Sequence, residues 1–178
     1  GGFGAETLWS HEIGGKWQVL DGRGLLSAAL FWIDADHWQE YNVLTDASGR
    51  ALSTNLITSD ATLRSRGGEV EFTWRASDAW DVAASLGVVD SKYRTYRFTA
   101  QQDFSGNRTK LVPRYDAALS ASWRPGSGLF VRGELEALGR TPLDPGNTVF
   151  QESVVLGNLQ VGWEGDRWSA RMFVDNVT

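Results

Sequence analysis

Six side chains in this sequence have the chemistry to bind an anion. A guanidinium group holds an anion by charge and hydrogen bonds, and a nearby aromatic ring adds cation–π contact to a cationic partner. Four of the six alternate at the beginning of a long polar connection. The plainer interpretation, which we favour for all six, is a set of solvated loop and interface residues. The residues are Arg64, Arg66, Tyr93, Arg94, Tyr96 and Arg97.

Two histidines and two aspartates could in principle support metal binding or acid–base catalysis. They are His11, Asp34, Asp36 and His37. The two aspartates are also ordinary acids of an alternating strand, and His37 falls on the opposite face from them. The sequence contains no zinc-protease motif, nucleophile elbow or phosphate-binding loop. We therefore expect no catalytic residue, no metal site and no cofactor.

Composition excludes several classes of protein. The net charge of −5 argues against a nucleic-acid surface, which needs clustered Lys and Arg. The absence of cysteine excludes disulfide scaffolds and thiol catalysis. No apolar run is long enough for a membrane helix, but a transmembrane barrel would look the same, because its lumen residues dilute the lipid-facing ones.

The elements that position these side chains are β-strands. From Glu69 to Trp74, apolar and polar residues alternate strictly, and after a turn at 76–79 the alternation resumes from Trp80. Such a run gives a strand one polar and one apolar face. The same pattern predicts an all-β antiparallel meander of about eight strands, near residues 8–19, 25–36, 66–74, 80–93, 115–124, 129–137, 155–163 and 168–175. Long polar connections are expected at about 39–61, 94–111 and 139–148.

Two features favour a transmembrane barrel over a soluble sandwich. Short and long connections alternate, so all tight turns fall at one end of the meander, as in outer-membrane barrels. Tryptophan gathers beside those turns, where indoles favour the lipid headgroup region. The predicted belt is Trp17, Trp74, Trp80, Trp123, Trp163 and Trp168, and a second belt at the other end would contain Trp32, Trp38, Tyr41, Tyr93 and Tyr96.

In a barrel the polar faces must point inward, away from lipid. Charges of both signs would then line the interior, which suits either water or contact with a polar plug. The predicted inward residues are Glu12, Lys16, Asp34, Asp36, Glu69, Glu71, Arg75, Arg124, Arg132, Glu134, Glu136 and Arg171.

Short motifs follow one another in an order that resembles the C-terminal part of the barrel of TonB-dependent outer-membrane receptors. The match with the hairpin pattern N…RG-x-E-x-E, at Asn55 and Arg66 to Glu71, is the most specific. The other motifs are Glu12 to Lys16, Phe31 to Gln39, Gly87 with Tyr93, Gly106-Asn107 with Pro113, Asn147, and Phe173 to Asn176, although Val177-Thr178 ends before the last Asp of that pattern.

This resemblance implies a barrel of about 22 strands with an N-terminal plug, located in the bacterial outer membrane. It implies energy-coupled uptake of a scarce nutrient such as an iron–siderophore complex, with the TonB complex as partner through the plug. Residues 1–178 would be a single region of the barrel wall and its external loops, without the plug or the final strand. Alone, it would form an open, curved sheet. The six anion-binding candidates would then be contacts for an anionic iron chelate.

Two alternatives stay open at this point. Eight strands can close into a complete small outer-membrane barrel with a structural or adhesive role. The second alternative is a soluble carbohydrate-binding sandwich with exposed Trp, which would stay monodisperse without detergent.

Overall fold

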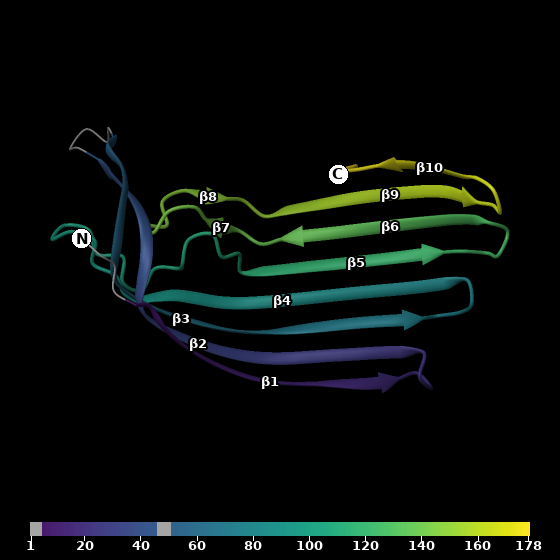
Figure 1. Cartoon of the computed structure of the whole chain (residues 1–178), viewed down its shortest axis with the longest axis horizontal. Coiled ribbons are helices and arrows are strands. Elements are labelled where there is room, and N and C mark those ends of the chain that lie inside the picture. Colours follow the sequence, from purple (N-terminus) through teal and green to yellow (C-terminus); the bar gives the residue numbers. More distant parts are fainter. Residues whose placement is uncertain (1–4, 46–50) are drawn as a thin grey trace.

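The computed structural model describes the backbone of residues 5–45 and 51–178, and the side chains of residues 5–40 and 61–178. Eight strands form one antiparallel sheet, in the order β1-β2-β3-β4-β5-β6-β9-β10 (Figure 1). The predicted all-β meander of eight strands is therefore confirmed. No helix in the described residues is long and apolar enough to cross a membrane. The strands are β1 Thr7–Val19, β2 Gly24–Thr45, β3 Ala51–Arg75, β4 Trp80–Thr95, β5 Tyr115–Trp123, β6 Leu129–Leu138, β9 Val154–Glu164 and β10 Ser169–Val174, with a small separate pair of β7 Thr141–Pro142 and β8 Phe150–Gln151.

The two ends of the sheet differ, as the sequence predicts. Four short turns connect β1 to β2, β3 to β4, β5 to β6 and β9 to β10, all at the right of Figure 1. We name this the turn end. The opposite end, the loop end, carries the connections 96–114 and 139–153 and the far part of the β2–β3 hairpin. Within the described ladders β1 and β10 are the two edges and do not pair with each other.

The register gives the sheet one apolar and one polar face, since residues directly opposite on paired strands share a face. Ile13 pairs with Leu30, whereas Glu12 pairs with Phe31. Ile13 is 73% exposed and Leu30 64%, values that indicate contact with lipid rather than with water. The apolar face, from β1 to β10, consists chiefly of Ile13, Leu26, Leu30, Val70, Phe72, Leu86, Leu119, Val131, Leu135, Leu159, Val161 and Met172.

The polar face carries the charged ladder that the sequence predicts. Ten of the twelve residues expected to point inward lie on this face. Arg124 is placed there by its stacking on the ring of the polar-face residue Phe130. The other nine are placed there by register: Glu12, Lys16, Glu69, Glu71, Arg75, Arg132, Glu134, Glu136 and Arg171. Glycine lets the backbone pack closely here. A Cβ on Gly67 would meet the carbonyl oxygen of Val88 and the ring of Phe31, so the aromatic ring takes the place of the missing side chain.

The prediction for the other two residues, Asp34 and Asp36, is wrong. Asp34 pairs with Trp9 and Arg64, in line with Leu30 on the apolar side of the sheet. Asp36 pairs with Thr7 on the same side. Apart from Ser27, residues 25–30 are apolar on both faces, so alternation alone could not fix the facing of β2.

The segment predicted as a long polar connection, 39–61, belongs instead to a single long hairpin. β2 continues to Thr45 and β3 begins at Ala51, with register shifts between Ala35 and Trp38 and again further along. Pairing persists because backbone hydrogen bonds do not need apolar alternation once the strands extend beyond a buried or lipid-covered region. Side chains of Tyr41 and Asn55 lie outside the described residues.

The tryptophan belt at the turn end is present. Trp17, Trp74, Trp80, Trp123 and Trp163 all have registers on the apolar face. Neighbouring indoles are in contact, with ring centroids 6.3 Å apart for Trp80 and Trp123. Trp168 lies beside Trp163, at 4.5 Å between centroids.

The predicted second belt is only partly correct. Trp32 lies on the apolar face. Tyr93 and Tyr96 instead belong to a buried cluster with Ala35, Ala61 and Leu63, against which Trp38, Phe98 and Phe104 pack. A single sheet has no second layer, so a buried core forms only where the 96–114 loop folds back onto it.

Candidate functional site

The structure separates the six anion-binding candidates into three groups. Arg64, Arg66 and Arg94 lie on the apolar side of the sheet above its apolar residues, where Arg64 binds Asp34 at 2.8 Å and Arg94 approaches it at 3.8 Å. Arg66 binds Asp90 at 3.4 Å, and both Arg64 and Arg66 stack on Trp32. This arrangement makes the three arginines part of an ionic ladder and not of one pocket with the tyrosines.

The two tyrosines are enclosed. Tyr93 is 0% and Tyr96 1% exposed, and their ring centroids are 4.9 Å apart. Phe104 meets Tyr96 edge-on at 5.3 Å. Arg97 is exposed near the beginning of the loop and pairs with Asp103 at 3.4 Å. Whether any of these residues contacts a ligand stays a prediction.

A buried charged network underlies the tyrosine cluster. Glu40 is 4% exposed, and its carboxylate accepts a hydrogen bond from Tyr93 Oη at 2.8 Å and one from Trp38 Nε1 at 3.0 Å. Lys110 Nζ lies 2.6 Å from the other carboxylate oxygen. These contacts attach the 96–114 loop to β2 and β4 at one point. Nothing in the sequence pattern indicates that Glu40 pairs with Lys110. The two residues are 70 positions apart, and neither belongs to a regular alternation.

Two asparagines join the 96–114 loop to the 139–153 loop. Asn147 accepts a hydrogen bond from the Arg108 backbone N–H at 2.9 Å and donates one to the Arg108 carbonyl at 3.0 Å. Asn107 donates to the Pro145 carbonyl at 2.9 Å. Asn147 has a φ of 55°, a left-handed conformation that asparagine tolerates better than most residues. The resemblance singles out both asparagines, and the structure gives them a physical role as connections between loops.

Asp144 organises the turn that presents Asn147. Its carboxylate accepts hydrogen bonds from the backbone N–H groups of Thr148 at 2.8 Å and Val149 at 2.7 Å, and from the Thr148 hydroxyl at 3.0 Å. Burial acts to raise the pKa of Asp144, but these hydrogen bonds outweigh it and hold the pKa below the ordinary value. At pH values above the ordinary pKa of an aspartate, the ionised carboxylate of Asp144 therefore stabilises the turn. This contribution is lost as the pH falls through the lowered pKa that Asp144 has in the folded protein.

Replacing Asn147 by glycine is expected to loosen both loops while leaving the sheet intact. Glycine keeps the positive φ, so the change isolates the lost side-chain hydrogen bonds, each of about 0.5–1.5 kcal/mol. Exchange of amide hydrogens in residues 105–111 and 139–153 should accelerate by roughly ten- to a hundred-fold. Hydrogen–deuterium exchange with mass spectrometry measures this. Asn158→Gly, on the polar face of β9, is the control, and unchanged loop exchange in the Asn147 variant would contradict the assignment.

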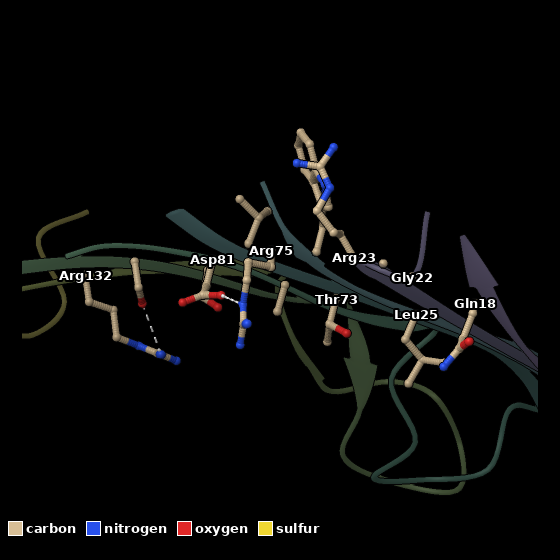
Figure 2. Close-up of a pocket in the computed structure, with 14 residues that line it drawn as sticks. Gln18, Gly22, Arg23, Leu25, Thr73, Arg75, Asp81 and Arg132 are labelled. Atoms are coloured by element: carbon tan, nitrogen blue, oxygen red, sulfur yellow. Dashed lines mark hydrogen bonds and ion pairs between the residues drawn. The ribbon is translucent and has the colours of Figure 1, made fainter. Parts of the chain in front are cut away.

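At the turn end the polar face is hollowed. A pocket of about 580 Å³ lies over strands β1 to β6, lined by residues that include Gln18, Thr73, Asp81 and Arg132. Figure 2 shows Gln18, Leu25, Thr73, Arg75, Asp81 and Arg132 along one side of the sheet, with Arg23 extending to the other. Arg75 lies 3.8 Å from Asp81.

Those charges have partners but remain accessible. Arg132 donates to Glu134 through Nε at 2.8 Å and to the Ser122 hydroxyl at 3.4 Å. A wall with mixed charges and hydroxyls suits water or a polar protein surface, and it provides no nucleophile with an adjacent base. In the described part of the chain no three His, Asp or Glu side chains form a group that could hold a metal ion.

Comparison with known proteins gives consistent matches. The family model for the β-barrel of TonB dependent receptor-like proteins matches residues 1–177. Pesticin receptors of Yersinia enterocolitica and Yersinia pestis are 27% and 26% identical to this chain over 181 aligned residues. Each alignment covers 98% of this chain and 25% of the receptor, so the chain spans about a quarter of the length of these relatives.

Solved structures show the same fold. The ferric yersiniabactin uptake receptor FyuA of Yersinia pestis matches with a TM-score of 0.76 and 22% identity, over 97% of this chain and 25% of FyuA. The siderophore receptor PiuA of Acinetobacter baumannii matches with a TM-score of 0.74 and 19% identity, over 96% and 24%. The copper transporter OprC also matches, with a TM-score of 0.74 and 13% identity, over 99% and 26%. At these identities the structural likeness establishes the fold and leaves the cargo open.

Proposed function

Since this chain belongs to the TonB-dependent receptor β-barrel family, whose members are outer-membrane barrels, we propose that it forms part of the wall and external loops of a receptor that imports a ferric siderophore. The larger receptor supplies the remaining strands and a plug. The plug contacts the TonB complex and couples uptake to energy from the inner membrane. The chain itself contributes walls and loops, and it performs no chemistry on the cargo.

The observation that carries this proposal is the separation of faces. The apolar face has Leu30 and Ile13 more than 60% exposed, while the polar face of the same sheet carries Glu12, Glu69 and Glu71. Lipid outside and a hydrated interior are the environments that stabilise both faces at once. The polar pocket at the turn end then faces the interior, where a plug would lie.

The cargo is proposed from the relatives. The relatives include pesticin receptors, and two of the structural matches are by name a ferric yersiniabactin uptake receptor and a siderophore receptor. Ferric siderophores are commonly anionic, and the 96–114 loop offers Arg97 as an exposed cation. Of the six candidates, we propose Arg97 as the residue that meets ligand on the outer side of the loop.

Charge reversal at Arg97 tests the cargo. In the full receptor, Arg97→Glu is expected to weaken binding of a ferric siderophore roughly two- to five-fold, the range of one exposed ionic contact. Arg167→Glu, an exposed arginine in the turn between β9 and β10, makes the same charge change at the opposite end and should leave binding unchanged. Binding of radioactive iron complexes to cells, and growth on each siderophore as the iron source, measure the effect. Loss of the receptor gene without loss of uptake of any ferric siderophore would refute the cargo.

A further inference from the structure

The polar hollow at the turn end carries more positive than negative charge. Arg75 and Arg132 line it together with the carboxylate of Asp81, and Figure 2 shows these three side chains on the same side of the sheet. Arg124 lies next to the hollow, since its guanidinium group is 3.9 Å from Asp81, close to the 3.8 Å of Arg75. Glu134 neutralises Arg132, so one carboxylate is shared by two arginines.

Arg75 and Arg124 have unused hydrogen-bonding capacity. Each guanidinium group carries several N–H donors, and neither side chain donates a hydrogen bond to the residues that the structure describes. Their distances to Asp81 are too long for hydrogen bonds. Arg75 is 71% and Arg124 54% exposed, so both can reach a ligand in the hollow. An anion with several oxygen atoms is the ligand that such a pair recognises.

The floor of the hollow offers polar contacts without bulky side chains. Thr73, Ser120 and Ser122 supply hydroxyl groups, and Ala83 lies among them. The volume of about 580 Å³ falls within the range of small-molecule sites, about 300–1,000 Å³. The wall therefore leaves room for a small ligand at this point of the interior.

Further from the turns, the polar face carries the opposite charge. Glu12, Glu69 and Glu71 line a second hollow together with one cation, Lys16. Within the described part of the chain, none of these three carboxylates has an ion pair. On this wall an anion is therefore repelled midway along the sheet and attracted at the turn end.

We propose that the hollow at the turn end is an exit site for anionic cargo, where a ferric siderophore binds Arg75 and Arg124 before it leaves the barrel. The inference rests on the proposed function, which supplies the cargo. Short turns lie on the periplasmic side of outer-membrane barrels, so imported cargo emerges at the turn end. The site is separate from Arg97, which belongs to the loop end. The carboxylates midway along the sheet oppose the return of a bound anion.

The test uses the full receptor in detergent, with a fluorescent label at the turn end. This chain contains no cysteine, so Ser127→Cys in the β5–β6 turn provides one site for the label. A trianionic iron(III) tris-catecholate complex is the probe, because bound iron quenches a nearby fluorophore. Saturable quenching is expected in the otherwise unchanged receptor. Arg75→Gln/Arg124→Gln should weaken binding about four- to twenty-fold, since each exposed ionic contact contributes roughly two- to five-fold.

Two controls test whether charge at this position is responsible. Arg23→Gln/Arg167→Gln removes the same charge at the turn end, but Arg23 extends to the other side of the sheet in Figure 2. This variant should keep the dissociation constant within about two-fold of the wild-type value. An equal loss would mean general charge attraction and would overturn the proposal. An uncharged iron(III) tris-hydroxamate complex should bind about four- to twenty-fold more weakly, and equal binding would also overturn it.

Stability and uptake measurements separate the remaining explanations. Both substituted arginines are exposed, so the fold should persist, and circular dichroism checks this. If Arg75→Gln/Arg124→Gln lowers the unfolding temperature and leaves quenching unchanged, the arginines hold another segment of the receptor and the exit site is refuted. Uptake of a ferric siderophore by cells without saturable quenching would refute the exit site alone. Quenching without uptake of any ferric siderophore would refute the proposed function, and the exit role with it.

Discussion

Arginine in place of Leu119 is expected to destabilise the membrane-inserted receptor by about 2–4 kcal/mol, the cost of a charged side chain near the bilayer midplane. Leu119 lies on the apolar face, midway along β5 between Tyr115 and the belt residue Trp123. Its side chain is 47% exposed because in the membrane its neighbours are acyl chains. Unfolding by denaturant in lipid vesicles measures the change.

The neighbouring residue is the matched control. Ser120 has the opposite facing, paired with Glu134 on the polar face. Ser120→Arg therefore places the same charge beside a carboxylate and in contact with water, and it should change the free energy of unfolding by less than about 1 kcal/mol. Equal costs at the two positions would mean that lipid does not cover the apolar face, and the assignment of faces would fail.

Removing the ammonium group of Lys110 should have an effect of similar size on the loop end. Lys110→Met leaves the Glu40 carboxylate buried at 4% exposure with no cation at 2.6 Å. An uncompensated buried charge costs about 3–5 kcal/mol. The loss should appear as faster amide exchange in residues 104–110, which lie next to this network, with little change in β5, β6 and β9.

A second variant separates the charge from the packing. Glu40→Gln combined with Lys110→Met removes both charges while the amide oxygen still accepts from Tyr93 and Trp38. This double variant should recover most of the loss, because no buried charge is left unpaired. If it is as unstable as Lys110→Met alone, the lysine acts through its packing and the ion pair contributes little.

Alternation along the sequence determined the strands because strand side chains repeat every two residues regardless of what the rest of the chain does. The Glu69–Trp74 run and its return from Trp80 predicted β3 and β4 with the correct facing. The tryptophan belt was equally visible, since Trp17, Trp74 and Trp163 lie within a few residues of short turns. A local periodicity therefore specified the sheet and the medium on each side.

The facing of Asp34 and the burial of Tyr93 depended on contacts between distant segments. In β2, residues 25–30 are apolar on both sides apart from Ser27, so only pairing with β1 and β3 decided that Asp34 joins Leu30 and that Phe31 covers Gly67. No local pattern reports the pairing partner of such a strand.

By itself, then, the sequence determined an all-β meander with one lipid-facing and one polar side, and its motifs indicated the family. Tertiary structure decided the polar contacts of the loop end: Glu40 pairs with Lys110, Asn147 hydrogen-bonds to the Arg108 backbone, and Asp90 lies beside three cations. The physical reason is that strand periodicity is a property of neighbouring residues. Ion pairs and loop contacts form between residues tens of positions apart, and folding alone brings these together.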